Sequence, residues 1–255
     1  MSITAPRLAA ALALATALPA APALAEIVGE PFRYTVGDTE FEGYVARNSD
    51  LAESRGTVLI VHDWDGMTGY EERRAEMLAA LGYTAFAIDV YGADTDPQSV
   101  DEYRALSGSL YGDRALFQER LMGSIMAAAD IPGATDDMVM IGYCFGGAAV
   151  LEAARAGADL EGFVSFHGGL GTPEGQSYAA TTGPVLLLHG SADPVSGMAD
   201  LAALLDELQA AGVEHGAEVF GGARHSFTVF GSNDYDLEAD RESWEALTEF
   251  LEASL

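Results

Sequence analysis

The sequence predicts an α/β fold: a doubly wound, mostly parallel sheet of about eight strands, opened by an N-terminal β-hairpin. Two observations support this prediction. Short apolar segments alternate along the chain with longer segments of helical pattern, and most of them are too short and too uniformly apolar to be half-exposed strands. The ligand site of such a sheet lies outside the carboxyl ends of its strands.

The elements follow in order from this alternation. A hairpin comes first, because segments 32–36 and 41–46 flank the turn sequence Gly37-Asp38-Thr39-Glu40. The strands expected after it are 58–61, 85–88, 138–141, 162–166, 185–188 and 217–220. The helices expected between and after them are 70–81, 97–106, 113–129, 146–156, 198–211 and 237–253. The sequence shows no internal repeat and no linker rich in Pro, Gly or Ser, so a single domain is predicted for residues 26–255.

Residues 1–25 have the pattern of a secretory signal peptide. A single cationic residue precedes the apolar run 8–18, and the ending Ala23-Leu24-Ala25 is typical of a cleavage site before Glu26. A membrane anchor is disfavoured, because Pro19 and Pro22 end the run short of the roughly 20 apolar residues that a span needs. The sequence therefore predicts an exported protein, periplasmic or secreted, without stable membrane association.

The chain is strongly acidic, with 40 Asp and Glu against 12 Lys and Arg and a formal net charge of −28. Such a surface repels nucleic acid and anionic lipid headgroups, so neither is an expected partner. The acids are spread along the chain and form no block. This distribution favours a strongly hydrated surface suited to saline surroundings over a site for one specific cationic partner.

The clearest chemical motif directly follows the strand predicted to end at Ile141. The segment Gly142-Tyr143-Cys144-Phe145-Gly146 has the Gly-x-nucleophile-x-Gly form of a nucleophile elbow, with Cys in place of the commoner Ser. Its glycines suit a tight turn that holds the nucleophile in a strained conformation. The start of the following helix favours a thiolate, and the amide of Phe145 can donate into an oxyanion hole. Taken alone, the motif also fits an inert, buried cysteine.

Two further residues have the placement of a catalytic base and its orienting carboxylate. Asp193 follows a predicted strand end, and His225 comes shortly after the last predicted strand. Cys, Asp and His in this order is the chain order of α/β-hydrolase sites. In this hypothesis His225 removes the thiol proton and Asp193 fixes the imidazole tautomer. The chain has one cysteine, so no internal disulfide competes for the thiol.

With these motifs in place, the sequence resembles the dienelactone hydrolase family over nearly the whole of residues 26–255. The segments that carry the resemblance are His62-Asp63-Trp64-Asp65-Gly66, Asp89-Val90-Tyr91-Gly92, Gly142-Tyr143-Cys144-Phe145-Gly146-Gly147, His189-Gly190-Ser191-Ala192-Asp193-Pro194 and His225-Ser226-Phe227. The resemblance implies an α/β-hydrolase fold, a Cys–His–Asp triad and hydrolysis of a small-molecule ester or lactone through an acyl-thioester, without a cofactor. It also implies that Asp63, where the family usually has glutamate, pairs with the resting thiol. The amide of Trp64 would then complete the oxyanion hole.

One position departs from the family pattern. The type enzyme of the family grips an anionic lactone with arginines, one of them four residues after the catalytic histidine, where this chain has Val229. Arg104 and Arg114 both lie in the region of a second family arginine. Loss of a charge-assisted contact, worth on the order of 1.5–3 kcal/mol, favours a generic ester or a differently substituted lactone over dienelactone itself. Tyr91, Arg114 and Phe166 are the further candidates for substrate contact.

Three more histidines, His62, His167 and His189, end predicted strands. They show no zinc-type spacing, so we expect them to hydrogen-bond the strand-end loops, and we expect no metal site. Two other functions stay open on the sequence. One is acyl transfer or thioester hydrolysis at the same site, and the other is a non-catalytic ligand-binding or redox-sensing protein that keeps the fold.

Overall fold

A computed structural model describes residues 1–2 and 26–255 of the chain. The predicted signal peptide lies, from residue 3 onward, outside the described residues. The strands are β1 (Ile27–Val36), β2 (Thr39–Asn48), β3 (Thr57–Val61), β4 (Thr84–Ile88), β5 (Met138–Tyr143), β6 (Gly162–Phe166), β7 (Val185–Gly190) and β8 (His215–Phe220). The α-helices are α1 (Gly69–Ala80), α2 (Val100–Gly112), α3 (Arg114–Ala127), α4 (Phe145–Arg155), α5 (Met198–Ala211) and α6 (Leu237–Ser254). Two short 3₁₀ helices are η1 (Ala128–Asp130) and η2 (Tyr178–Ala180).

The strands form an eight-stranded sheet in the order β1-β2-β4-β3-β5-β6-β7-β8. β1 and β2 form an antiparallel hairpin, and β2 joins β4 in antiparallel register. The remaining neighbours are parallel. Strands β3, β4, β5 and β6 are buried at every position, as expected for parallel strands covered on both faces. The predicted fold class is confirmed, including the N-terminal hairpin.

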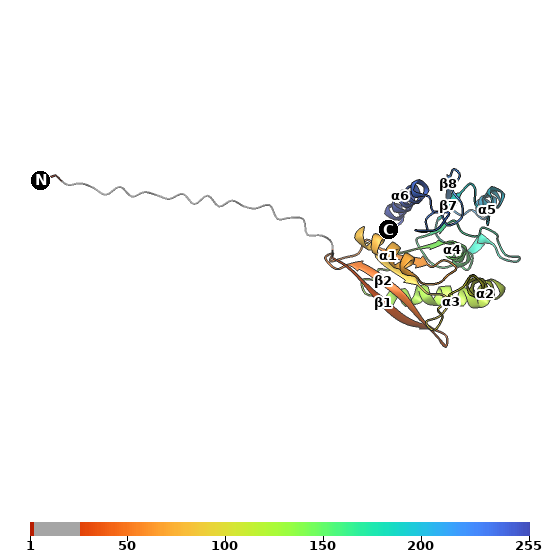
Figure 1. Ribbon diagram of the computed structural model, residues 1–255, viewed down its shortest axis with the longest axis horizontal. Coiled ribbons are helices and arrows are strands. Elements are labelled where there is room, and N and C mark those ends of the chain that lie inside the picture. Colours follow the sequence, from red (N-terminus) through yellow and green to blue (C-terminus); the bar gives the residue numbers. More distant parts are fainter. Residues whose placement is uncertain (3–25) are drawn as a thin grey trace.

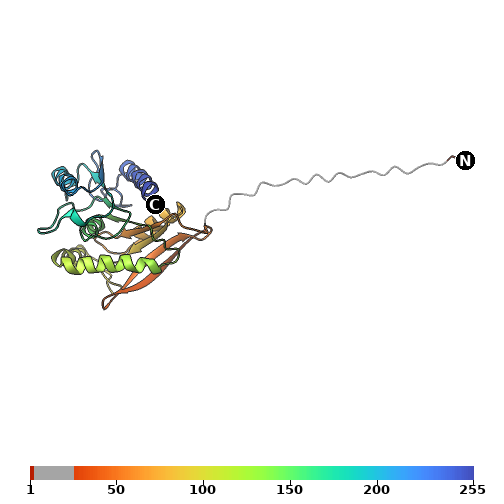
Figure 2. The ribbon, with the colours of Figure 1, turned by 180° about the vertical axis from the view of Figure 1, so that it is seen from behind.

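Helices cover both faces of the sheet (Figure 1). α1 and α6 pack on one face, where Leu78 and Leu247 belong to one hydrophobic cluster. α3, α4 and α5 pack on the other, where Phe117 and Leu204 belong to a second cluster. Figure 2 shows α3 lying along the β1–β2 hairpin, which it contacts through β1. The central strands β3, β4, β5 and β6 are therefore buried between two helical layers.

Helix α2 differs from its prediction, since it begins at Val100 and ends at Gly112 instead of covering 97–106. The side chain of Ser99 caps its start by accepting a hydrogen bond from the amide of Glu102 at 3.4 Å. Its end is set by Asp113, which caps the start of α3. The segment 107–112, by which α2 extends beyond its predicted end, carries residues that reach the candidate site.

The direction in which the chain crosses the sheet changes at β3. From β3 the chain moves to β4 on one side and then returns to β5 on the other. Ligands of open α/β sheets bind at such a switch point, outside the carboxyl ends of the strands. Asp63 and Trp64 lie in the loop after β3 and Cys144 follows β5, so these three predicted site residues lie at this switch point.

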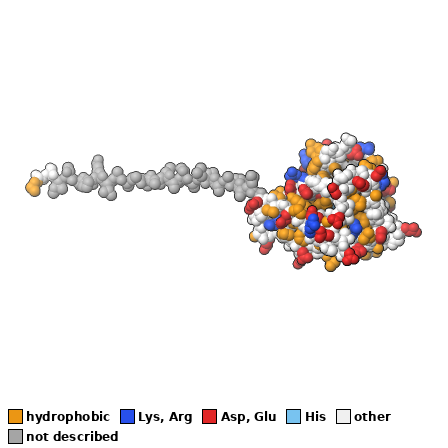
Figure 3. Space-filling view, turned by 60° about the horizontal axis from the view of Figure 1, so that its bottom comes forward, with side chains coloured by type: hydrophobic (Ala, Val, Ile, Leu, Met, Phe, Trp, Pro, Cys, Tyr) orange, Lys and Arg blue, Asp and Glu red, His pale blue; other side chains and the backbone are white. Residues whose placement is uncertain are grey.

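The acidic residues are dispersed over the surface. On the face shown in Figure 3, Asp and Glu side chains occupy many separate places, with fewer Arg side chains among them. Some pair with arginines, as Glu40 and Glu42 do with Arg33, each at 2.6 Å. Within residues 1–2 and 26–255, no helix combines the length and the apolar character needed to cross a bilayer.

Candidate active site

Cys144 lies on a sharp turn between β5 and α4. Its backbone has φ 52° and ψ −111°, a strained conformation for a residue with a side chain. A Cβ on Gly142 would lie 2.3 Å from the carbonyl oxygen of Gly146, and one on Gly146 would lie 2.1 Å from that of Val61. Both positions therefore require glycine, which explains the elbow motif in physical terms.

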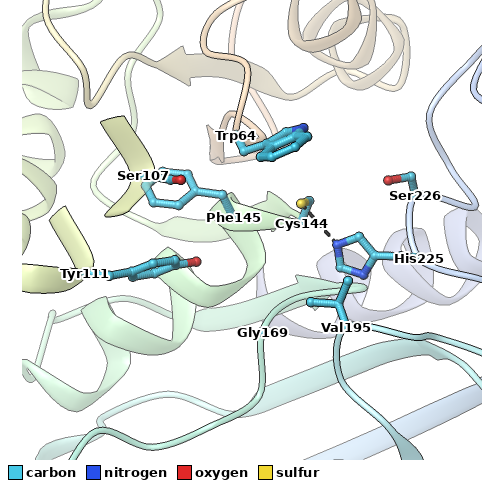
Figure 4. Close-up of a pocket in the computed structure, with 9 residues that line it drawn as sticks. All are labelled: Trp64, Ser107, Tyr111, Cys144, Phe145, Gly169, Val195, His225 and Ser226. Carbon is cyan, nitrogen blue, oxygen red and sulfur yellow. Dashed lines mark hydrogen bonds between the residues drawn. The ribbon is translucent and has the colours of Figure 1, made fainter. Parts of the chain in front are cut away.

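The structure brings Cys144, His225 and Asp193 together. His225 Nε2 lies 3.1 Å from Cys144 Sγ, a contact drawn as a dashed line in Figure 4. His225 Nδ1 lies 2.8 Å from Asp193 Oδ2. With the ring hydrogen on Nδ1 and donated to Asp193, Nε2 is left to accept a proton from the thiol.

The carboxyl group of Asp193 is held in its ionised form. Burial raises its pKa, but the hydrogen bond and charge of His225 act in the opposite direction, as do the amides of Val195 and Ser196. Those amides donate to Asp193 Oδ1 at 2.7 and 3.3 Å. The net result is a pKa below the usual value, which suits a carboxylate that orients a histidine.

The surroundings of Cys144 favour its neutral thiol over the thiolate. Burial raises its pKa well above the usual range, and the nearby carboxyl of Asp63 raises it further. The backbone amides of Phe145 and Trp64 act in the opposite direction through hydrogen bonds. Both amides predicted for the oxyanion hole thus lie at the reacting centre.

Asp63 is buried among other carboxyl groups. Burial raises its pKa well above the usual value, and neighbouring Asp65 and Glu71 add to that increase. The amide of Asp65 donates to Asp63 Oδ1 at 3.2 Å, and Glu71 Oε1 accepts from the amide of Asp63 at 3.3 Å. Burial also raises the pKa of Glu71 to about 7. This side of the site therefore disfavours additional negative charge.

A cavity of about 290 Å³ opens beside Cys144. Aromatic rings, an aliphatic side chain and hydroxyl groups form most of its wall (Figure 4). The lining residues are Trp64, Ser107, Tyr111, Cys144, Phe145, Gly169, Val195, His225 and Ser226. Within the part of the chain that the structure describes, no Arg, Asp or Glu lines this cavity. Its volume is at the lower end of the roughly 300–1,000 Å³ of small-molecule sites, so it suits a compact, uncharged group.

Tyr91 and Phe166, predicted to contact substrate, lie outside the cavity wall. The hydroxyl of Tyr91 donates to the carbonyl oxygen of Trp64 at 3.0 Å, and its ring packs on Phe145 with centroids 5.5 Å apart. Phe166 is buried against Tyr143, with ring centroids 4.6 Å apart. Tyr91 supports two wall residues from behind, whereas Phe166 belongs to the core.

The arginines predicted near the site do not line the cavity either. Arg114 pairs with buried Glu152 at 3.0 Å, and its guanidinium lies 4.9 Å from the ring centre of Tyr111. Arg104 is exposed and pairs with an acid on its own helix. Val229, at the position of a family arginine, is not a lining residue. Arg114 does not line the cavity, because its guanidinium group forms an ion pair with Glu152 instead.

Five of the wall residues were not predicted from the sequence: Ser107, Tyr111, Gly169, Val195 and Ser226. Ser107 and Tyr111 lie one helical turn apart on the same face of α2, beyond its predicted end. Both lie within the six residues, 107–112, by which α2 extends beyond its predicted end. Val195 and Ser226 lie within two residues of a triad member, and that proximity was their available signal.

The strand-end histidines hydrogen-bond the loops around them, as predicted. His62 Nε2 accepts from the amide of Val90 at 3.2 Å, and His189 Nε2 lies 2.9 Å from the carbonyl oxygen of Ser196. His167 contacts the nucleophile elbow. Among the described residues, no three His, Cys, Asp or Glu side chains gather in an arrangement that could hold a metal ion.

The eight-stranded sheet and the strand–Cys144–helix elbow define an α/β-hydrolase. Comparison with protein families assigns it further, since the model of the dienelactone hydrolase family matches residues 41–255. The chain belongs to the dienelactone hydrolase family and is a carboxylic ester hydrolase.

Solved structures agree with this assignment. A protein named m3DLH is 29% identical with a TM-score of 0.83, covering 90% of this chain and 99% of its own. A dienelactone hydrolase-like promiscuous phosphotriesterase from metagenomic libraries is 30% identical with a TM-score of 0.82, covering 89% of this chain and 98% of its own. A relative was also found by sequence. An uncharacterized protein of Caenorhabditis elegans is 30% identical over 142 residues, which cover 52% of this chain and 90% of that relative.

Proposed function

We propose that this hydrolase cleaves small esters or lactones with Cys144 as nucleophile, His225 as base and Asp193 as the group that orients the base. The observation that carries the proposal is the unbroken path of contacts from Sγ through the imidazole to the carboxylate, 3.1 and 2.8 Å long. The path ends at the one sulfur that faces the cavity among the described residues. Geometry of this kind is the signature of an activated nucleophile.

The reaction would proceed through two tetrahedral intermediates. His225 Nε2 takes the thiol proton, and the sulfur attacks the carbonyl carbon while the π electrons move onto oxygen. That oxyanion accepts hydrogen bonds from the amides of Phe145 and Trp64. Collapse expels the alkoxide, which receives the proton held by His225, and leaves an acyl-thioester on Cys144. Water, deprotonated by His225, then attacks the thioester and releases the acid and the thiol.

We also propose that Asp63 guards the resting thiol. Once ionised, Asp63 favours the neutral thiol, because a second negative charge beside a buried carboxylate is unfavourable. A neutral thiol resists oxidation better than a thiolate, which is an advantage for an exported protein. Reactivity would then appear when substrate occupies the cavity.

The substrate class we favour is uncharged in its acyl part. The cavity offers aromatic rings and hydroxyls and no arginine among the described residues, so an anionic acyl group would lose its water without gaining a cation. p-Nitrophenyl butyrate and p-nitrophenyl hemisuccinate, which differ mainly in a terminal carboxylate, test this directly. We expect kcat/KM to be at least about tenfold higher for the butyrate, equivalent to roughly 1.4 kcal/mol. Equal values or a preference for the hemisuccinate would contradict the assignment.

Two related activities use the same site. Acyl transfer would appear as transfer products when alcohol or thiol acceptors are added to the assay, and thioester hydrolysis would appear as free thiol released from an added thioester. Similarity to the promiscuous phosphotriesterase supports neutral phosphotriesters as a second substrate class, and paraoxon is the probe for it. A ligand-binding or redox-sensing protein would be silent toward esters, lactones and paraoxon, and Cys144 would acquire no acyl group.

The test of the nucleophile compares the wild type with Cys144→Ala and Cys144→Ser on p-nitrophenyl acetate. We expect the alanine variant to lose essentially all turnover above the uncatalysed rate, because no other sulfur or hydroxyl replaces Sγ in the path. The serine variant should retain a small residual rate, since a hydroxyl is a weaker nucleophile beside the same base. Undiminished turnover in Cys144→Ala would remove the proposal.

We further propose that residues 1–25 are a signal peptide and that the mature enzyme works in the periplasm or outside the cell. Its support is the sequence pattern, a short apolar run followed by Ala23-Leu24-Ala25. N-terminal sequencing of the protein recovered from an expressing bacterium should begin at Glu26. Recovery of chains that begin at Met1 from the cytoplasm alone would contradict export.

A further inference from the structure

The strained backbone positions of the molecule gather at the active site. Among the described residues, three non-glycine residues have a positive φ: Cys144 at 52°, His167 at 39° and Ser226 at 39°. Cys144 is the proposed nucleophile and Ser226 directly follows the proposed base. His167, at the end of β6, has no role in the proposed reaction. Such conformations persist only where surrounding contacts enforce them, so the contacts of His167 are informative.

His167 connects the two halves of the proposed triad. Its Nδ1 accepts a hydrogen bond from the amide of Cys144 at 3.1 Å, and that amide hydrogen is shared with the carbonyl oxygen of Phe166, also at 3.1 Å. Because Nδ1 accepts, the ring hydrogen is on Nε2, which donates to Thr228 Oγ1 at 2.8 Å. Thr228 lies three residues after His225 in the same loop. His167 thus bridges the elbow and the loop that carries the base.

The arrangement works only while His167 is neutral. A protonated ring would present an N–H toward the amide of Cys144, and the two donors would repel each other. The ring is fully buried, and burial lowers the pKa of His167 well below its usual value, with the nearby ring of His225 adding to the decrease. The His167 and His225 ring centroids lie 5.4 Å apart in an edge-to-face arrangement.

The bridge is anchored on the helices of one face of the sheet. The hydroxyls of Thr228 and Tyr70 lie 2.7 Å apart, and Arg74 donates to the carbonyl oxygen of Thr228 at 2.8 Å. Tyr70 and Arg74 belong to α1, and Arg74 forms a buried ion pair with Asp240 of α6. Thr228 is therefore fixed by its side chain and its backbone at once.

We propose that His167 is a positioning residue for hydrolysis, acting with Thr228 to hold the base against the nucleophile; this inference rests on the proposed function. Cys144 follows β5 and His225 follows β8, two strands separated in the sheet by β6 and β7. The contact between base and sulfur therefore spans loops that the sheet does not join directly. The two hydrogen bonds of His167, to the amide of Cys144 and to Thr228, connect those two loops a second time, beside the contact between base and sulfur. A displacement of about 1 Å in such a contact can lower the rate about a hundredfold.

Thr228→Val tests the bridge, because valine has nearly the shape of threonine and lacks the hydroxyl. We expect kcat on p-nitrophenyl acetate to fall about ten- to a hundredfold, with KM changed less than about twofold, since the cavity wall is untouched. Labelling of Cys144 by iodoacetamide, which needs the base but no substrate, should slow in parallel. Thr228→Ser, which keeps the hydroxyl, should restore both rates.

Thr57→Val is the matched control. Thr57 is also buried, and its hydroxyl lies 2.9 Å from that of Thr135. It lies at the amino end of β3, whereas the candidate site lies beyond the carboxyl ends of the strands. Its substitution should lower stability without changing kcat or the labelling rate.

Wild-type rates in Thr228→Val would overturn the inference, as would equal losses in Thr57→Val. If Thr228→Val does not fold, Tyr70→Phe takes its place, because it removes a partner of the Thr228 hydroxyl. Its kcat and its rate of labelling by iodoacetamide are then compared with those of the wild type. A wild type that neither turns over esters nor acquires an acyl group would instead overturn the proposed function.

Discussion

Two loops at the carboxyl edge of the sheet, 62–68 after β3 and 191–197 after β7, each place a buried aspartate beside the reacting groups. Asp193 meets donors: His225 and two backbone amides, which lower its pKa. Asp63 meets other carboxyls, Asp65 and Glu71, and its pKa is raised, most of all by burial. One side-chain type thus acquires opposite proton affinities at neighbouring places.

This difference separates two tasks. In the proposed mechanism, the β7 loop supplies a permanent negative charge that stabilises the imidazolium formed during the reaction. The β3 loop supplies a carboxyl that ionises at a higher pH than usual and that, once ionised, is proposed to disfavour the thiolate until substrate arrives. The strand ends determine where the two aspartates lie, and the groups that contact each aspartate determine its pKa.

The largest effect should come from the β7 loop. Asp193→Asn keeps the size of the side chain but removes the charge and can hold the imidazole in the wrong tautomer, so we expect kcat to fall about 10²–10⁴-fold. Steady-state kinetics on p-nitrophenyl acetate measures it. Asp206→Asn, on the exposed side of α5, is the control and should behave as the wild type. A loss of less than about threefold in Asp193→Asn would mean that the base is oriented by other groups.

The carboxyl groups around Asp63 should affect the pH dependence of stability, and Glu71 of α1 is the one to test. The pKa of Glu71 is about 7 in the folded protein, against an ordinary 4.5, so the unfolded chain loses this proton first as pH rises. The folded state is therefore favoured below about pH 4.5, and this contribution, on the order of 3 kcal/mol, is lost as pH rises to 7. Glu71→Gln cannot titrate. Thermal unfolding at pH 5 and 7.5 should show a smaller decrease in Tm for the variant, and parallel decreases would contradict the assignment.

The smallest effect concerns the resting thiol. Asp63→Asn should lower the pKa of Cys144, so iodoacetamide labelling of the free enzyme at pH 8 should become about tenfold faster for each pKa unit lost. Asp65→Asn is the matched comparison, because the carboxyl of Asp65 raises the pKa of Cys144 less than that of Asp63 does, so its removal should give a smaller increase in labelling rate. An unchanged rate in Asp63→Asn would make the guarding role wrong while leaving the nucleophile assignment intact.

Much of the fold could be predicted from the sequence, because local patterns determine it. Strands such as β6 are apolar at nearly every position and are bounded by polar turns, and the elbow at Cys144 has a local glycine signature. Chain order then placed Asp193 and His225 at the same edge of the sheet. These features need no knowledge of distant contacts.

Part of the cavity wall and the bridge could not be predicted, because they depend on contacts between residues far apart in the chain. Whether Arg114 reaches the site depends on its ion pair with Glu152, which lies 38 residues away in the sequence. The contact between His167 and Thr228 joins residues 61 positions apart, and neither residue has a local motif. Tertiary contacts of this kind leave no periodic trace in the sequence.

The most direct test of the account is the identity of the acylated residue. The wild-type enzyme is mixed with p-nitrophenyl acetate, quenched in acid during turnover, digested and analysed by mass spectrometry. The account predicts an acetyl group on the peptide that contains Cys144, bound through sulfur and released by hydroxylamine. An acetyl group on another residue, or continued p-nitrophenol release with no acyl group on Cys144, would contradict it.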